Sequence, residues 1–378
     1  LSYGIYKTDM PADKTTNVAF VDCGAMDTTV TIVAFVKGKL TVLATACDRN
    51  LGGRDFDMIL AEHFAAEWKE KHKIDAKTNK KAMYRLVTAA EKTKKVLSAN
   101  PQAPINIECF MEDIDVKGMM DRSEMLSVAE PLLVKLDALM AEALEGSGLT
   151  KDDINSVEIY GGTSRIPAVQ DRISAFFAKP TCSKTLNFDE CVAKGCALQC
   201  AMLSPAFKVR DFQVNDVTLY PIALSWSSSG GAANGNEAME VEGENDEAAK
   251  PASGSNTVVF SKFNSVPNTK MLTFYRKDTF SLTAAYDGSV SLPNGFPTKL
   301  ADYTIADIPK GVPDVDGKVD PAKIKVKLRL DIHGCLVLES AVAIEEQEVV
   351  EEVAAAPSPP PAPPAEGAAP AAEPPAEG

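Results

Sequence analysis

Residues 18–35 (VAFVDCGAMDTTVTIVAF) contain two apolar runs separated by a short stretch of small and polar residues. The first run stops at Asp22, and after the break Val30, Ile32 and Ala34 alternate with Thr31, Val33 and Phe35. This pattern predicts a strand, a turn and a second strand. Such a turn, with an aspartate and a glycine at its start, is a common way to offer backbone N–H groups to a phosphate, yet Gly24 is its only glycine. An ordinary core hairpin with Asp22 capping the turn is the alternative interpretation.

Long helices with one apolar face follow this hairpin. Residues 54–73 carry apolar side chains at helical spacing after a Leu-Gly-Gly turn, and residues 127–148 do so before two glycine stop signals. Thr150 is a predicted N-cap ahead of a short apolar strand at 157–160. Strands that alternate with long helices up to about residue 207 predict an α/β fold.

After Pro205 the pattern changes to short strands separated by Gly, Pro and Asn, without a long helix. The clearest alternation places apolar Ile324, Val326, Leu328, Leu330 and Ile332 between Lys323, Lys325, Lys327, Arg329 and Asp331. A His333-Gly334 turn follows, so the pattern predicts a hairpin with one buried face, in a β-sandwich or a barrel.

These patterns divide the chain into segments. We expect an α/β domain at 1–207, an interdomain linker at 208–215, a β-sandwich domain at 216–344 with an insertion at 227–256, and a tail at 345–378. The insertion has no hydrophobic period and no aromatic residue, and the tail is rich in Pro, Ala and Glu, so both are predicted to be disordered. Because the chain starts at Leu1 without a methionine or a signal segment, we expect it to be incomplete at its N-terminus.

The net charge of −14 is concentrated in two of these segments. Residues 227–256 hold six acidic residues and one lysine, and residues 345–378 hold eight acidic residues and no base. The rest of the chain is left with about −1 and has no basic face for a phosphate backbone, which argues against nucleic-acid binding. No stretch approaches the roughly 20 apolar residues that span a bilayer, so we expect no membrane role.

The chain has eight cysteines but no C-x-x-C pair. Cys191, Cys196 and Cys200 share one helical pattern with no histidine near them. Small reduced thiols are therefore the main interpretation, and zinc ligation is the alternative. Reduced thiols indicate the cytosol, and we add the nucleus as a second expected compartment.

The segment AAEKTKKVLSAN places four polar residues on one helix face: Glu91, Lys94, Lys95 and Ser98. An apolar stripe lies directly beside this face, and Lys94 is close to the seam between the two. A solvated charged face with a favourable Glu91–Lys95 pair is one interpretation. The other is a half-buried polar edge suited to a ribose and a base.

The segment EIYGGTSRIPAVQ runs from a strand into Gly161-Gly162, where the backbone can approach a ligand closely because no Cβ intervenes. Pro167 then starts a helix whose N-terminal dipole faces the same place. Arg165 projects from this junction and is able to lay its guanidinium on a flat ring.

These residues carry a family resemblance. Residues 1–207 resemble the second lobe of the actin-like ATPase domain of the seventy-kilodalton heat-shock (DnaK-type) chaperones, through SYGIYK, LGGRDFD, EKTKKVLSAN, VEIYGGTSRIPAVQ and NFDECVAKGCALQ. IECFMEDIDVKG, KGCALQCAMLSPAFKVRDF and LTFYRKDTF are similar to the large, hundred-and-ten-kilodalton branch of that family. The resemblance spans roughly the first 340 residues and implies a β-sandwich peptide-binding domain after the lobe.

The resemblance also implies site residues, with ATP or ADP as cofactor and magnesium bound in the intact protein. Asp22 matches an aspartate that orients the attacking water, and Asp189 matches an acidic residue of the cleft. The remaining matches are cofactor-binding: Gly24 at the phosphate hairpin, Glu91, Lys94, Lys95 and Ser98 around the adenosine, and Gly161, Gly162, Thr163 and Arg165 closing over the base.

The match stops after Gly24. The smaller relatives continue with further glycines, a threonine and an aspartate, whereas this chain has Ala25, Met26 and Asp27. Ala and Met do not adopt φ > 0 freely, and Asp27 brings a negative charge towards the phosphates. We therefore expect adenosine binding with altered phosphate handling, so that ATP hydrolysis is weak in the intact protein and absent in this chain, which lacks the first lobe.

The resemblance implies an ATP-binding chaperone that acts as nucleotide exchange factor for a seventy-kilodalton chaperone and holds unfolded polypeptides. An ATP-hydrolysing foldase with its own cycle is the alternative. An actin-like or sugar-kinase-like enzyme is a third hypothesis, and the predicted β-sandwich domain argues against it.

Overall fold

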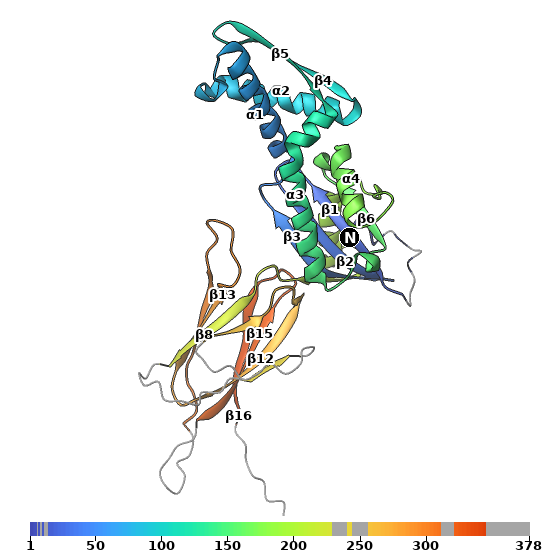
Figure 1. Ribbon diagram of the computed structural model, residues 1–378. Helices are drawn as coiled ribbons and strands as arrows, with labels where there is room; N and C mark the ends of the chain where they lie inside the picture. The colour runs from blue at the N-terminus through green and yellow to red at the C-terminus, as the bar shows by residue number, and fades with distance from the viewer. Residues whose placement is uncertain are drawn as a thin grey trace, which may run out of the picture.

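The computed structural model describes residues 1–5, 7, 10, 14–228, 240–243, 256–310 and 321–344. Figure 1 shows a mixed α/β part followed by a part built of strands, with α3 (Arg122–Ser147) running from the helical end of the first part towards the second. In the described part of the chain, no helix is long and apolar enough to span a bilayer.

A six-stranded sheet forms the centre of the first part, in the order β11-β7-β3-β2-β1-β6. Its strands are β1 (Thr16–Cys23), β2 (Thr28–Val36), β3 (Lys39–Asp48), β6 (Ser156–Tyr160), β7 (Gln213–Val217) and β11 (Ser265–Val266). Neighbours β1, β2 and β3 are antiparallel, whereas β6 runs parallel to β1 and β7 parallel to β3. The predicted strand, turn and strand over 18–35 is confirmed, with the turn at 24–27.

The helices form because their apolar positions recur at helical spacing, and α3 lies against the sheet. The other helices are α1 (Gly53–His72), α2 (Lys80–Ala99), α4 (Pro167–Phe176) and α5 (Cys191–Leu203), with short 3-10 turns η1 (Ala76–Thr78), η2 (Lys151–Asp153) and η3 (Gly162–Arg165). Along α1 the buried side chains include Phe56, Leu60, Phe64 and Trp68, one per turn. Both α1 and α3 confirm the helices predicted from the pattern, and α3 packs against β2 and β3.

A separate hairpin, β4 (Gln102–Met111) and β5 (Ile114–Asp121), packs on α1 and α2. Trp68 of α1 lies edge-on to Phe110 of β4, with ring centroids 5.3 Å apart. The sequence patterns above did not identify these two strands. Figure 1 shows this hairpin and the two helices gathered at one end of the molecule.

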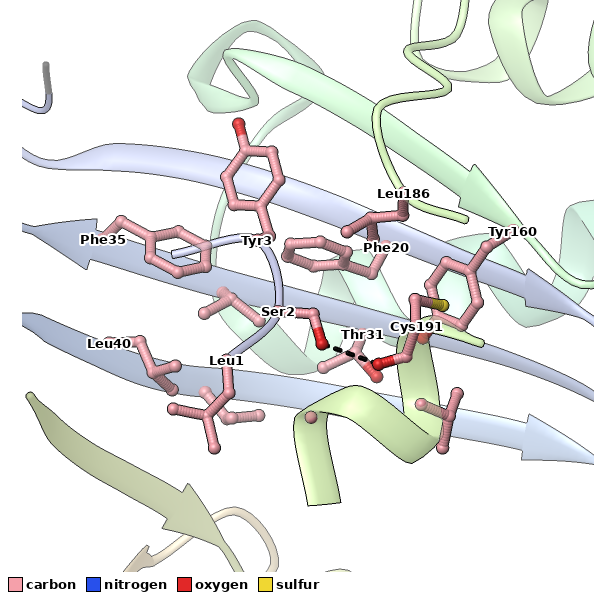
Figure 2. Close-up of a pocket in the computed structure, with 14 residues that line it drawn as sticks. Leu1, Ser2, Tyr3, Phe20, Thr31, Phe35, Leu40, Tyr160, Leu186 and Cys191 are labelled. Atoms are coloured by element: carbon pink, nitrogen blue, oxygen red, sulfur yellow. Dashed lines mark hydrogen bonds between the residues drawn. The ribbon is translucent and has the colours of Figure 1, made fainter. Parts of the chain in front are cut away.

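The face of the sheet remote from α3 carries a smaller apolar cluster built on Tyr3, Phe20 and Phe35, whose ring centroids are 5.3 to 6.0 Å apart. An apolar cavity of about 270 Å³ lies beside it, between residues 1–3, the strands and α5. Figure 2 shows the Ser2 hydroxyl at its edge, where Oγ donates a hydrogen bond to the Cys191 carbonyl at 2.6 Å.

The second part consists of two four-stranded antiparallel sheets. One has the order β10-β8-β13-β14, from β10 (Asn256–Phe260), β8 (Ile222–Ser228), β13 (Phe280–Tyr286) and β14 (Lys299–Ile305). The other has the order β16-β15-β12-β9, from β16 (Leu336–Ile344), β15 (Ala322–Leu330), β12 (Asn268–Arg276) and β9 (Glu240–Gly243). Side chains of both sheets, such as Trp226, Leu282, Phe274 and Val326, form one hydrophobic cluster.

The predicted hairpin at 323–344 is present as β15 and β16, with Gly334 at φ 73° in its turn. Ile324, Val326, Leu328 and Leu330 are buried as the alternation predicted, but Ile332 lies beyond the strand and is exposed. The buried face of the hairpin therefore ends one apolar position earlier than the pattern indicated.

Two expectations about connecting segments need correction. The predicted insertion, 227–256, is not irregular throughout: 227–228 end β8, Asn256 begins β10, and Glu240–Gly243 is a strand paired with β12. The predicted linker, 208–215, includes the start of β7, which pairs with β3. The rest of the insertion and the tail at 345–378 lie outside the described residues.

Candidate nucleotide-binding site

The β1–β2 turn is built without left-handed residues. Its ends are joined by a hydrogen bond from the Gly24 N–H to the Asp27 carbonyl at 2.9 Å, and none of residues 24–27 has a positive φ. Ala25 and Met26 are therefore unstrained, which corrects the expectation that a glycine-poor turn is a conformational problem here. A Cβ at Gly24 would come no closer than 3.3 Å to the Asp27 carbonyl oxygen.

This turn sits on the N-terminus of α1. The N–H groups of Gly53 and Arg54 donate to the carbonyls of Gly24 and Ala25, at 3.0 and 2.9 Å. A Cβ at Gly52 would lie 2.6 Å from the Ala25 carbonyl oxygen, so the approach requires a glycine. The first N–H groups of α1, which would otherwise be an anion site, are thus used by the turn.

The N–H groups at the tip of the turn remain available. Within the described residues, no hydrogen bond uses the N–H of Ala25, Met26 or Asp27, and all three residues are exposed. Successive backbone N–H groups at an exposed tip are suited to a phosphate. The turn therefore fits a nucleotide phosphate through these groups and not through a helix N-terminus.

Gly161 brings the end of β6 against the end of β1. It has φ 83°, and a Cβ there would lie 2.4 Å from the Cys23 carbonyl oxygen and 2.5 Å from Asp22 Oδ1. Two residues later, the Thr163 hydroxyl donates to the Gly24 carbonyl at 2.7 Å. Gly162 meets nothing within 4 Å of its missing Cβ. The GGTSR segment is thus joined directly to the β1–β2 turn. A shared nucleotide site at this junction stays a prediction.

Asp22 lies half-buried at this junction. Burial, with a smaller contribution from the charge of Asp27, raises its pKa to about 6. Burial also raises the pKa of the neighbouring Tyr160 phenol. Asp22 is paired across the parallel β1–β6 ladder with Tyr160, directly before Gly161.

Lys94, which the pattern places close to the seam of the predicted polar face of α2, lies on the buried side of it. Its Nζ is buried, 2.7 Å from Asp57 Oδ1 and 2.8 Å from the Gly53 carbonyl oxygen to which it donates. Burial raises the pKa of Asp57, and Lys94 opposes that shift. The predicted face of α2 is therefore divided: Lys94 points beneath the turn and supports the start of α1.

The other three residues of that face are at the surface. The Lys95 ammonium lies 2.6 Å from a carboxylate oxygen of Glu91, which lowers the pKa of Glu91 and raises that of Lys95. The Ser98 hydroxyl donates to the Lys94 carbonyl at 3.1 Å. These contacts match the interpretation of a solvated face, and an adenosine contact stays a prediction.

Arg165 and Asp189 pair with one another. Their closest atoms are 3.2 Å apart, both side chains are exposed, and the guanidinium carbon lies 5.3 Å from the ring centroid of Phe188. Arg165 thus already lies over a flat ring, although that ring belongs to the protein and not to a base.

The site residues fall into a joined group and a surface group. Hydrogen bonds and close contacts connect Asp22, Gly24, Gly161, Thr163 and Lys94, whereas Glu91, Lys95, Arg165 and Asp189 make exposed ion pairs. Sequence reasoning missed Gly52, Gly53 and Asp57. A pair of glycines at the start of a predicted helix was a usable signal for Gly52 and Gly53. No sequence signal indicated the pairing of Asp57 with Lys94. No group of three or more metal-ligating side chains occurs among the described residues.

Comparison with known proteins agrees with this geometry. The family model described as Hsp70 protein matches residues 1–359. Heat shock protein hsp88 of Neurospora crassa is 46% identical over 355 residues, covering 93% of this chain and 47% of the relative. Heat shock 70 kDa protein 14 of Arabidopsis thaliana is 45% identical, covering 92% of this chain and 39% of the relative.

Heat shock 70 kDa protein 4 of Homo sapiens is also 45% identical, over 91% of this chain and 38% of its own length. The chain thus spans less than half the length of these relatives. The match nevertheless extends over almost all of the chain, including the segments that form the site. The chain therefore belongs to the Hsp70 protein family, in its large, hundred-and-ten-kilodalton branch.

Proposed function

We propose that the full-length protein binds ATP, acts as a nucleotide exchange factor for a seventy-kilodalton chaperone and holds unfolded polypeptides, in the cytosol and the nucleus. The observation that carries the nucleotide part is the turn at 24–27. Three N–H groups at its exposed tip have no hydrogen bond within the described residues, while the carbonyls of Gly24 and Ala25 are bound to α1 and Thr163. Membership of the Hsp70 family supports ATP or ADP as the ligand, with magnesium. All eight cysteines are free thiols, which supports a reducing compartment.

The surface group would hold the nucleoside. Arg165 would move from Phe188 to the base, and Glu91, Lys95 and Ser98 would face the ribose from α2. A bound magnesium ion would neutralise phosphate charge next to Asp22. The carboxylate of Asp27 lies at the same turn and repels a phosphate, so this chain would hold a nucleotide more readily than it would stabilise a transferring phosphoryl group.

The strand-built part would hold unfolded chains. Its two sheets share one apolar cluster, and extended peptides bind such sheets through main-chain hydrogen bonds with pockets for alternate side chains. The seventy-kilodalton chaperone would be the partner from which ADP is released, and neither nucleic acid nor a membrane is expected as a partner.

An ATP-hydrolysing foldase is the second candidate. Asp22 favours it, because a carboxyl with a pKa of about 6 is mostly ionised at pH 7 and is then able to orient a water molecule. An actin-like or sugar-kinase-like enzyme has no observation in its favour beyond the first part of the chain.

Two measurements on the full-length protein separate these functions. The first is single-turnover ATP hydrolysis by the wild type and by the Asp22→Asn variant, and we expect slow turnover in both. The second is release of a fluorescent ADP from a purified seventy-kilodalton chaperone, which we expect to accelerate when the protein is added. Fast turnover that Asp22→Asn abolishes, without faster ADP release, would favour the foldase.

A further inference from the structure

The two edges of β12 are covered very differently. On one side β12 pairs with β15 at nine consecutive positions, from Asn268 to Arg276. On the other side, within the described part of the chain, it pairs only with β9, at the four positions 270–273. A strand edge presents a row of N–H and C=O groups that is able to take up another strand. Here a short piece of the acidic insertion occupies that row.

The register of β9 sets its two glutamate positions in rows that also contain lysine positions of β15. Glu240 stands opposite Thr273 and Glu242 opposite Met271. Across β12, Thr273 stands opposite Lys325 and Met271 opposite Lys327. Each glutamate position of β9 therefore lies in the same row as a lysine position of β15, two strands away, and the lysine at 327 also pairs with Glu339 of β16. Lysine positions in these rows favour an acidic strand over a basic one at this edge.

The ladder between β9 and β12 leaves one buried group unsatisfied. Thr273 is fully buried, and within the described residues its Oγ1 has no hydrogen-bond partner. A buried hydroxyl without a partner is unfavourable compared with the same hydroxyl in water. β9 is therefore not the best possible strand for this edge, and a strand with a hydroxyl opposite Thr273 would pair better.

We propose that the edge of β12 is a binding site for an extended acidic segment of another polypeptide, and that β9 occupies this site in cis until it is displaced. The site takes up a strand in which acidic and apolar residues alternate, as in Glu240-Val241-Glu242. The proposal rests on the proposed function of holding unfolded chains, and it names one class of segment that is held.

The test uses a fluorescein-labelled peptide of residues 236–246 (NEAMEVEGEND), added to the whole chain and followed by fluorescence anisotropy. The chain variant Val241→Pro removes an N–H and the extended pairing at the centre of β9 without shortening the insertion. The matched control is Ala238→Pro, which lies in the same insertion but outside β9. A second variant replaces residues 229–255 by a short Gly-Ser linker, so that the conclusion does not depend on one substitution.

We expect Val241→Pro and the deletion to bind the peptide at least about ten-fold more tightly than the wild type and Ala238→Pro do, because β9 no longer competes. A peptide with Glu240→Lys and Glu242→Lys should bind at least about five-fold more weakly, and one with Glu240→Thr more tightly. If both variants bind no better than the wild type, β9 only protects an edge and the proposal is overturned.

An apolar peptide tested in parallel keeps the two proposals distinguishable. Saturable binding of the apolar peptide, with no gain for the acidic peptide in either variant, would leave the proposed function standing and remove the edge site. Tighter binding of the acidic peptide to both variants, with no saturable binding of the apolar peptide, would establish the edge site. It would count against a general role in holding apolar chains.

Discussion

The Nζ atom of Lys94 on α2 lies 2.7 Å from Oδ1 of Asp57 on α1, and both side chains are about 10% exposed. The same ammonium donates to the Gly53 carbonyl, so one lysine joins the two helices beneath the β1–β2 turn. Lys94, which the family resemblance places at the adenosine, thus forms an ion pair within the protein.

Replacing Lys94 by methionine should destabilise the chain strongly, because it leaves the Asp57 carboxylate buried without its counter-charge. The expected loss is about 3–5 kcal/mol in the free energy of unfolding, measured by urea denaturation. Lys95→Ala is the matched control: its pair with Glu91 is exposed, and the expected loss is at most roughly 0.5 kcal/mol. Adding Asp57→Leu to Lys94→Met should restore much of the stability, and failure to do so would contradict the assignment of the loss to an unpaired charge.

Replacement by alanine should affect the two adjacent glycines of the GGTSR segment to very different extents. Gly161→Ala puts a Cβ 2.4 Å from a carbonyl oxygen at φ 83°, and it should cost about 3 kcal/mol and weaken nucleotide binding. Gly162→Ala has open space and an ordinary φ, so its change should stay within about 0.5 kcal/mol. Thermal unfolding and nucleotide titration of both variants provide the check. Equal effects would show that the close approach of β6 to β1 is unimportant.

The carboxyl of Asp22 should titrate near pH 6 in the folded chain, which carbon NMR of the carboxyl is able to follow. Because its ordinary value is 3.8, the folded state binds more protons than the unfolded state between pH 4 and 6, and this group makes stability fall as the pH rises through that range. Asp22→Asn should therefore be more stable than the wild type at pH 7, by on the order of 1–2 kcal/mol, and no more stable below pH 4.

Asp27→Asn removes the nearby negative charge and should therefore lower the pKa of Asp22. The pKa should stay above 3.8, because burial is the larger cause of its increase. A midpoint near 3.8 in the wild type would contradict a half-buried Asp22.

Arg165→Ala should weaken nucleotide affinity about five-fold, since stacking of a guanidinium on a ring contributes on the order of 1 kcal/mol. Fluorescent ATP binding to the full-length protein measures the effect. Arg172→Ala is the control: this arginine pairs with Asp137 on α3 and lies outside the proposed site. If both variants bind ATP as the wild type does, Arg165 does not contact the base.

The spacing of hydrophobic residues was sufficient to predict those elements that bury one face. The hairpin at 18–35, the helix α1 and the hairpin β15–β16 each bury one face, and that face was visible in the sequence. β9 was missed because an acidic segment that ends in glycine has low strand propensity, and it becomes a strand by pairing with the edge of β12.

Pairing between distant residues explains the remaining errors at the site. A helical wheel placed Lys94 at the seam between two faces, but only the fold brings Asp57 to it, 37 positions earlier in the chain. The position of Gly52 under the phosphate turn likewise depends on how β1, β2 and α1 meet. Sequence patterns located the segments of the site, whereas side-chain roles within them required tertiary contacts.

The strand β7 pairs with β3 at three positions on one side and with β11 at two positions on the other, whereas β1 and β2 pair at eight. A stretching force applied between the first and second parts of the chain would therefore load the shortest ladders first. The ion pair between Lys262 and Glu142, one of the side-chain contacts that also join the two parts, is largely exposed and adds little resistance. Under tension, the molecule should first extend by releasing β7 while both halves keep their folds, so that β7 acts as a mechanical release point between them.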